Sequence, residues 1–208
     1  MEFKLSFRHI ISHLLPGMLA SLEVIIALSL IIPNFKISDI ISLFGNTAMS
    51  IFLLTISGAV LGIFIDALQH YLFEELDGNK FVAEQLYKLA PKIFPKKSLI
   101  EWECLRKEKR DGKNSIKNKE QLMIYDYLVH ELFYYYYEAW INLGLSLSPL
   151  LLLLPSLFKK LSVSWLWVII SQVILIIVII ILFYEGVFTY FQYSQKDDDV
   201  LDSFKGIS

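Results

Sequence analysis

Four long apolar segments constrain what this chain can fold into more than any other feature. They cover residues 9–35, 40–65, 139–158 and 161–184. The hydrocarbon core of a bilayer is about 30 Å thick, so a helix needs about 20 mostly apolar residues to cross it. Each segment is long enough, whereas one small soluble domain would not bury four such helices. The sequence therefore predicts an all-α, polytopic membrane protein with four transmembrane helices.

The start of the first segment has some features of a signal peptide. Lys4 and Arg8 precede the apolar run, as basic residues do in a signal sequence. The apolar run then continues to Pro33, so we expect the helix to be retained. Residues 3–15 mix basic and apolar side chains, which predicts a short interfacial helix before Pro16 begins the first span.

Basic residues are distributed unequally between the loops, and this predicts the orientation. Residues 74–138 carry twelve Lys or Arg, and both chain ends add more, so sixteen of the nineteen lie on one side. By the positive-inside rule that side is cytoplasmic, which places both termini in the cytoplasm and the protein in the cell inner membrane. The outer loops, near 34–46 and 157–162, are short. They hold the other three basic residues, Lys36, Lys159 and Lys160.

The same pattern divides the chain into four parts. Residues 1–75 should form the interfacial helix and the first two spans, and residues 134–194 the last two. Residues 76–133 are polar and helix-forming, and we expect a cytoplasmic helical cap there. About 60 residues form a marginal core on their own, so this cap is not expected to be an independent catalytic domain. Residues 195–208 form an acidic cytoplasmic tail.

One face of the second span is lined by small and then by polar residues. Gly58 and Gly62 form a G-x-x-x-G pair, which allows two helices to approach closely in lipid. The same four-residue spacing continues through Asp66, His70 and Glu74. A helix face that carries glycines and then polar side chains should contact protein or water and not lipid. We therefore expect this face inside the bundle or at a subunit interface.

Other residues predict local features of the last two spans. A helical pattern begins near Ile116 and can continue into the third span, where Pro149 should introduce a kink. Asn142, Gly144, Ser146 and Ser148 give this span polar and small side chains. Such residues could form contacts between helices or line a path for water. Aromatic residues are enriched at predicted membrane boundaries. These are Trp165 and Trp167 outside, and Tyr134–Tyr137, Tyr184, Tyr190 and Tyr193 inside.

Histidines and carboxylates gather at the predicted cytoplasmic boundary. Several pairs are spaced four residues apart, which places both side chains on one helix face. Asp66 is the deepest member, and an ionisable group at such depth is costly unless it has a partner or a function. The others are His9, His13, His70, His130, Glu74, Asp126, Glu131, Glu138 and Glu185.

Three interpretations of this constellation remain open. The groups could hydrogen-bond to one another and to lipid head groups, which would fix the helix order. They could form a divalent metal site, for which Asp66, His70, His130 and Glu138 are the candidate ligands. They could also form a gate that responds to ions or protons, since histidine titrates near neutral pH.

Glu23 lies near the middle of the first span, where a lone carboxylate is expensive. We expect it to be protonated, or hydrogen-bonded to a polar group such as Ser57 or Gln172. In an oligomer, repeated copies could instead form a ring of charge along a pore. Glu23, Asp66 and Glu185 are therefore the candidate pore or intramembrane polar residues.

Two functions follow from these features. The first is a homo-oligomeric, non-enzymatic channel-like effector, or a membrane sensor or anchor subunit, with a cytoplasmic protein partner or signal. In shape it is similar to small four-helix components of bacterial operons, including anti-phage effectors and sensors. The alternative is a metal-dependent hydrolase or lipid-modifying enzyme at the inner leaflet. A net charge of −2 gives no reason to expect direct nucleic-acid binding.

Overall fold

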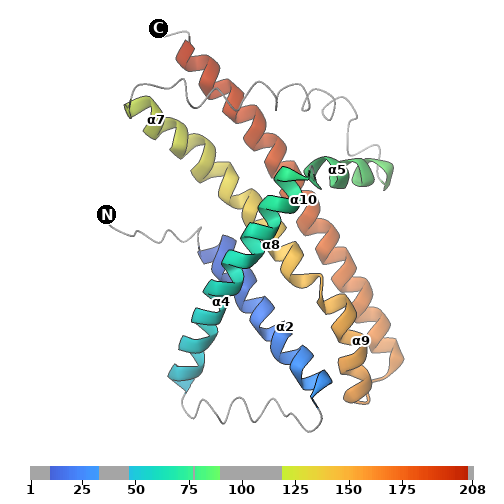
Figure 1. Cartoon of the computed structure of the whole chain (residues 1–208). Coiled ribbons are helices and arrows are strands. Elements are labelled where there is room, and N and C mark those ends of the chain that lie inside the picture. The colour runs from blue at the N-terminus through green and yellow to red at the C-terminus, as the bar shows by residue number, and fades with distance from the viewer. Residues whose placement is uncertain (1–9, 33–46, 77, 90–118, 206–208) are drawn as a thin grey trace. The chain divides into compact units, whose positions relative to one another are not determined.

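The computed structural model describes residues 10–32, 47–76, 78–89 and 119–205 (Figure 1). Every regular element in these ranges is helical, with η marking π-helical segments. The elements are η1 (Ile10–Leu14), α2 (Leu15–Ile31), α4 (Thr47–Gln69), η2 (His70–Glu75), α5 (Gly78–Leu89), α7 (Lys119–Tyr125), η4 (Asp126–Tyr134), α8 (Tyr135–Leu147), α9 (Leu150–Lys160) and α10 (Trp165–Lys205).

The chain divides into two compact units. The first unit comprises Met1–His70 and Ala139–Phe183, and the second unit comprises Tyr71–Glu138 and Tyr184–Ser208. Three helical elements, η2, α8 and α10, contribute residues to both. The units are described separately below, beginning with the first.

Within the described ranges, four helical stretches are long and apolar enough to cross a membrane. They are Ser12–Ile31, Ile51–Glu75, Tyr135–Lys160 and Trp165–Tyr193. The predicted all-α fold with four spans is therefore confirmed. The second stretch extends well beyond the predicted end at residue 65, because apolar and aromatic residues continue the helix after Asp66.

The first span has no break at Pro16. Ile10–Leu14 is the only described part of the predicted interfacial helix, and this π-helical segment continues directly into α2. Pro16 is the second residue of α2 and therefore lies in its first turn. The rest of the predicted interfacial helix lies outside the described residues.

Glycines bring α2 and η1 into backbone contact with α4. A Cβ atom added to Gly17 would overlap the carbonyl oxygen of Gly58, and one added to Gly62 would overlap the carbonyl oxygen of His13. Both glycines of the G-x-x-x-G pair are buried. The glycine part of the predicted row therefore lies inside the bundle, whereas His70 of the same row is exposed.

The third span is interrupted at Pro149, as predicted. Helix α8 ends at Leu147 and α9 begins at Leu150, although α7, η4 and α8 follow one another without a gap from Lys119. Pro149 has no N–H to donate to the carbonyl of Leu145, four residues earlier. The N–H of Ser148 donates to that oxygen instead, at 3.3 Å.

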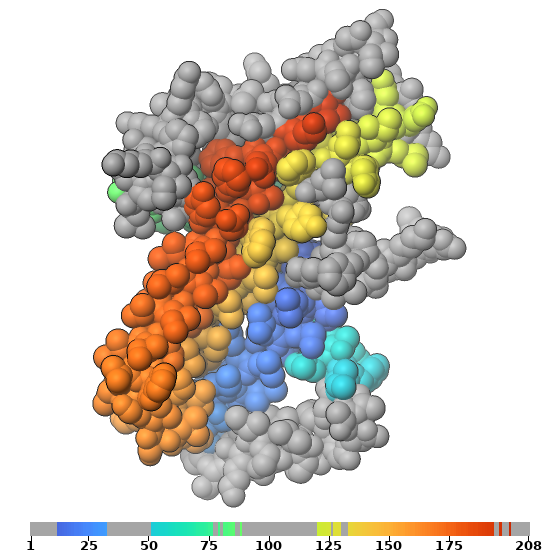
Figure 2. All heavy atoms as spheres, turned by 180° about the vertical axis from the view of Figure 1, so that it is seen from behind, coloured from blue at the N-terminus to red at the C-terminus, as the bar shows by residue number. Residues whose placement is uncertain are grey.

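A second proline, Pro155, lies inside α9 and removes the N–H that would bond to the carbonyl of Leu151. The side chain of Gln172, on α10, donates from Nε2 to this oxygen at 3.0 Å. Figure 2 shows α9 and the membrane-spanning part of α10, both in orange, packed against each other. Gln172 therefore supplies from a neighbouring helix the hydrogen bond that Pro155 removes within α9.

We predict that the stabilising effect of Gln172 depends on Pro155. Gln172→Leu should lower the free energy of unfolding by about 1–2 kcal/mol, because it leaves a half-buried carbonyl in the membrane-spanning region without a donor. In a Pro155→Ala background the helix supplies its own N–H, so the same substitution should have little effect. Thermal unfolding of the four proteins in detergent measures the coupling. Equal losses in both backgrounds would contradict this explanation.

The turn between α9 and α10 is tight and well defined. The N–H of Val163 donates to the carbonyl of Phe158 at 2.9 Å, and Ser162 has a positive φ of 55°. This is a Schellman motif, which ends a helix by satisfying its last carbonyls. Lys160 donates to the carbonyl of Ser29 near the end of α2, where a cation is electrostatically favourable.

Large apolar side chains are exposed along α4 and along the membrane-spanning part of α10. A soluble protein rarely exposes so much contiguous apolar surface, whereas a surface in contact with lipid requires it. The most exposed include Ile51, Phe52, Val60, Ile63 and Phe64 on α4, and Trp165, Leu166, Trp167, Ile169, Val173, Ile174 and Ile177 on α10.

In the second unit, tyrosines from α8, η4 and α10 form a cluster. The ring centres of Tyr137 and Tyr190 are 4.8 Å apart, and those of Tyr134 and Tyr193 are 5.3 Å apart. Tyr137 is completely buried, whereas Tyr136 is 46% exposed. The tyrosine run was predicted to mark a membrane boundary, but Tyr137 packs against other aromatic rings in the protein interior.

Polar groups of the second unit complete this cluster. Asn79, at the start of α5, donates from Nδ2 to the Tyr137 hydroxyl at 2.9 Å and to the Phe73 carbonyl at 3.2 Å. The Tyr134 hydroxyl donates to Glu74 Oε1 at 3.0 Å. Burial, followed by the nearby charges of Glu138 and Glu74, raises the pKa of Tyr134, which keeps its donor proton in place.

Candidate functional site

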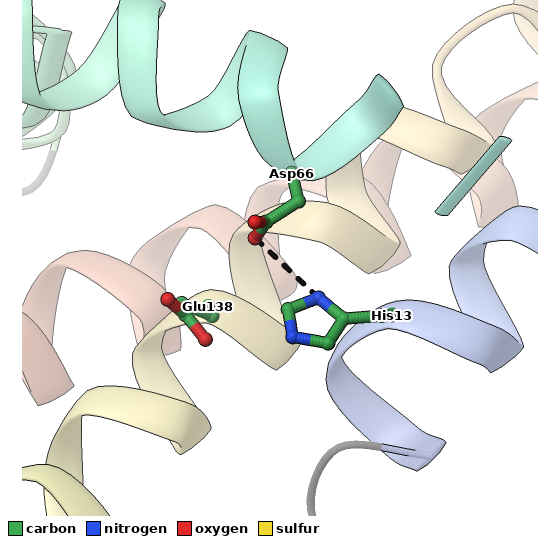
Figure 3. Close-up of side chains that lie close together, drawn as sticks. All are labelled: His13, Asp66 and Glu138. Carbon is green, nitrogen blue, oxygen red and sulfur yellow. Dashed lines mark ion pairs between the residues drawn. The ribbon is translucent and has the colours of Figure 1, made fainter. Parts of the chain in front are cut away.

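A polar cluster lies within the first unit, where η1 supplies two residues and α4 and α8 supply one each. His13 Nδ1 and Asp66 Oδ1 are 3.5 Å apart and face each other across the two helices (Figure 3). Asn142 Nδ2 donates to Asp66 Oδ1 at 3.2 Å and to the carbonyl of Ser12 at 3.0 Å. We call His13, Asp66, Asn142 and Ser12 the polar cluster.

The glycine row of α4 explains why these residues meet. Gly62 has no side chain, so the backbone of His13 can lie directly against it. Asp66 follows Gly62 by four residues and therefore lies on the same helix face. The close approach of the backbones places the imidazole beside the carboxylate.

Burial differs sharply within the polar cluster. The side chains of His13 and Asp66 are 28% and 34% exposed, whereas Ser12 and Asn142 are completely buried. Among the described residues, Ser12 Oγ and Asn142 Oδ1 have no hydrogen-bond partner. An imidazole, a carboxylate and two buried oxygens together can bind a cation or hold an ordered water.

The predicted metal ligands are divided between the two units. Asp66 and His70 belong to the first unit, and Asp66 lies beside His13, while the side chain of His70 is exposed. His130 and Glu138 belong to the second unit. The His130 side chain lies outside the described residues, and Glu138, also drawn in Figure 3, is buried. This four-residue metal site remains a prediction.

Glu23, on α2, is only 6% exposed, and its Oε1 has no hydrogen-bond partner among the described residues. Both partners suggested from the sequence were wrong. The Ser57 hydroxyl donates to the Leu54 carbonyl of its own helix at 3.2 Å. The amide of Gln172 donates to Leu151, whose carbonyl Pro155 leaves without a donor. The third intramembrane candidate, Glu185, is partly buried on α10 in the second unit.

Sequence reasoning named three of the four residues of the polar cluster but not the contacts between them. Asn142 was recognised as polar, and its two hydrogen bonds favour contact between helices over a water path. Ser12 gave no signal, because a single serine in an apolar helix is common. His13 was assigned to the boundary group, but its pairing with Asp66 depends on a contact that no local spacing encodes.

No protein-family model, curated protein or solved structure matches this chain. Its function is therefore inferred from the arrangement of its own residues.

Proposed function

We propose that this protein is a homo-oligomeric, channel-like effector or sensor subunit of the cell inner membrane. Both termini would lie in the cytoplasm, and a cytoplasmic protein or signal would act on the helical cap. The observation that carries the proposal is Glu23. A buried carboxyl group in mid-membrane is costly, and Oε1 of Glu23 has no hydrogen-bond partner among the described residues. Such groups commonly serve ion or proton movement.

The polar character of the bundle interior supports a conducting role. The buried residues of α2 include Ser21 and Ser29 as well as Glu23, and α8 buries Asn142 and Ser146. The exposed faces of α4 and α10 are apolar. Because Glu23 is buried within one chain, this arrangement favours a path through the bundle of each subunit over a ring of Glu23 around an oligomer axis.

The basic residues support the proposed cytoplasmic role. Sixteen of the nineteen basic residues lie in the segments assigned to the cytoplasm, which offers a surface for a partner or for anionic lipid. A bacterial defence-type system is a proposed setting that rests only on the analogy in shape to small four-helix effectors. Neither point affects the test of conductance.

Ion flux through proteoliposomes tests the proposal. The purified wild-type protein should release a potassium or proton gradient faster than empty vesicles. Glu23→Gln, which keeps the shape of the side chain but not its charge or proton, should reduce the flux at least tenfold. Glu84→Gln, at an exposed position of α5, is the matched control and should conduct like the wild type.

Two outcomes would count against this function. Wild-type vesicles that hold both gradients as well as empty vesicles would exclude the conducting role. A strictly monomeric particle, measured by light scattering in detergent and confirmed by cross-linking in membranes, would exclude the homo-oligomer.

A further inference from the structure

We propose that the polar cluster is a binding site for a divalent transition-metal ion of the zinc type, with His13 and Asp66 as ligands. Bound water would complete the coordination, and Asn142 would hold the Asp66 carboxylate from the outer sphere. This site is independent of the conductance proposed above, and either proposal can fail without the other.

The spacing of the two principal ligand atoms fits one shared ion. Zinc binds imidazole nitrogen and carboxylate oxygen at about 2.0–2.1 Å, and at a tetrahedral angle two such atoms lie about 3.3–3.4 Å apart. His13 Nδ1 and Asp66 Oδ1 are separated by 3.5 Å. Strong hydrogen bonds between charged groups are shorter, at about 2.7–2.9 Å, so the observed distance suits two ligands better than a tight ion pair.

The surroundings hold these ligands in position. Asn142 donates to Asp66 Oδ1 and also to the backbone of η1, so one amide group fixes both the carboxylate and the segment that carries His13. Outer hydrogen bonds of this kind orient metal-binding carboxylates. The contact between Gly62 and the His13 backbone sets the separation of the two helices.

Two further side-chain oxygen atoms belong to residues of the polar cluster. Asn142 reaches Asp66 Oδ1 and the Ser12 carbonyl through its Nδ2, and its other amide atom is Oδ1. Ser12, which directly precedes His13, carries the second oxygen, Oγ. Both oxygens are buried and have no hydrogen-bond partner among the described residues. Burying a polar oxygen without a partner is unfavourable, and a metal ion or its bound water would satisfy it.

The composition of the site selects the class of ion. Magnesium and calcium prefer sites made entirely of oxygen, whereas an imidazole combined with a carboxylate suits zinc and related transition metals. A divalent cation would also balance the charge of Asp66 at membrane depth. Bound in this position, it would link η1 to α4.

Zinc binding to the purified full-length protein tests the site. After removal of the affinity tag and treatment with a chelator, titration calorimetry should detect one high-affinity Zn²⁺ per chain. His13→Ala and Asp66→Asn should weaken binding by more than about 100-fold, and Asn142→Leu by about 10–100-fold, as for an outer-sphere partner. His70→Ala, at an exposed histidine, is the matched control and should bind zinc like the wild type.

A second measurement uses only the wild-type protein, so it does not depend on variants that fold. Diethylpyrocarbonate modifies accessible imidazoles, and mass spectrometry locates each modified histidine. Zinc should protect His13 at least tenfold and leave His70 unprotected. The proposal is overturned if the wild type binds no zinc, if His13→Ala binds it normally, or if zinc leaves His13 as reactive as before.

Discussion

Replacing Gly62 with leucine is expected to abolish the stable, monodisperse form of the protein. Even the single Cβ of Gly62→Ala would overlap the carbonyl oxygen of His13, which is backbone and has no rotamer to change. Alanine should therefore lower the free energy of unfolding by about 1–3 kcal/mol, the usual cost of overpacking, and leucine by more. The measurement is the fraction of monodisperse protein left after heating in detergent, followed by size-exclusion chromatography.

A neighbouring position on α4 provides the control. Ala67 is exposed, so Ala67→Leu adds the same side chain to the same helix on a face that lipid or detergent covers. It should leave the thermal midpoint nearly unchanged. If Gly62→Leu were as stable as Ala67→Leu, the close approach of α4 to η1 would be wrong, and the geometry of the polar cluster would be wrong with it.

Replacing Tyr137 with alanine should have a comparable effect in the second unit. The ring is completely buried against Tyr190 and Tyr134, so removing it should cost about 3–5 kcal/mol, as for other buried aromatic residues. Tyr137→Phe keeps the ring but removes the acceptor for Asn79, which should cost about 1 kcal/mol. Near-ultraviolet circular dichroism, which reports on ordered tyrosines, and thermal unfolding would measure both effects.

Tyr136 is the control for this series. It precedes Tyr137 in the same helix and is 46% exposed, so Tyr136→Ala should change stability by less than about 0.5 kcal/mol. Equal losses for the two tyrosines would show that the run acts as a membrane-boundary belt, as the sequence suggested, and not as an interior cluster.

The number of spans could be predicted from the sequence because it depends only on local apolar length. Their ends were less predictable. Because a charge normally marks the membrane boundary, Asp66 predicts that the second span ends at residue 65, but the helix continues to Gln69 and then as η2. One charged residue does not end a helix when the side chain has partners in the interior, as Asp66 has in His13 and Asn142.

The partners of the polar residues could not be predicted, because they depend on contacts between distant segments. Spacing of four residues suggested that Asp66 pairs with His70. The structure places Asp66 beside His13, fifty-three positions earlier, because Gly62 lets the two backbones touch. Gln172 was likewise predicted to bond to Glu23. It donates instead to the Leu151 carbonyl of α9, which has no helical donor because Pro155 lacks an N–H.

The short turn between α9 and α10 has a consequence for how the protein enters the membrane. If α9 inserted alone, the carbonyl of Leu151 would meet lipid without a donor, because Pro155 removes its helical partner. Only Leu161–Ser164 separates the two helices, and the first turns of α10 follow at once with Gln172. Insertion of both helices together, as a preformed hairpin, therefore avoids exposing that carbonyl to the hydrocarbon at any stage of biogenesis.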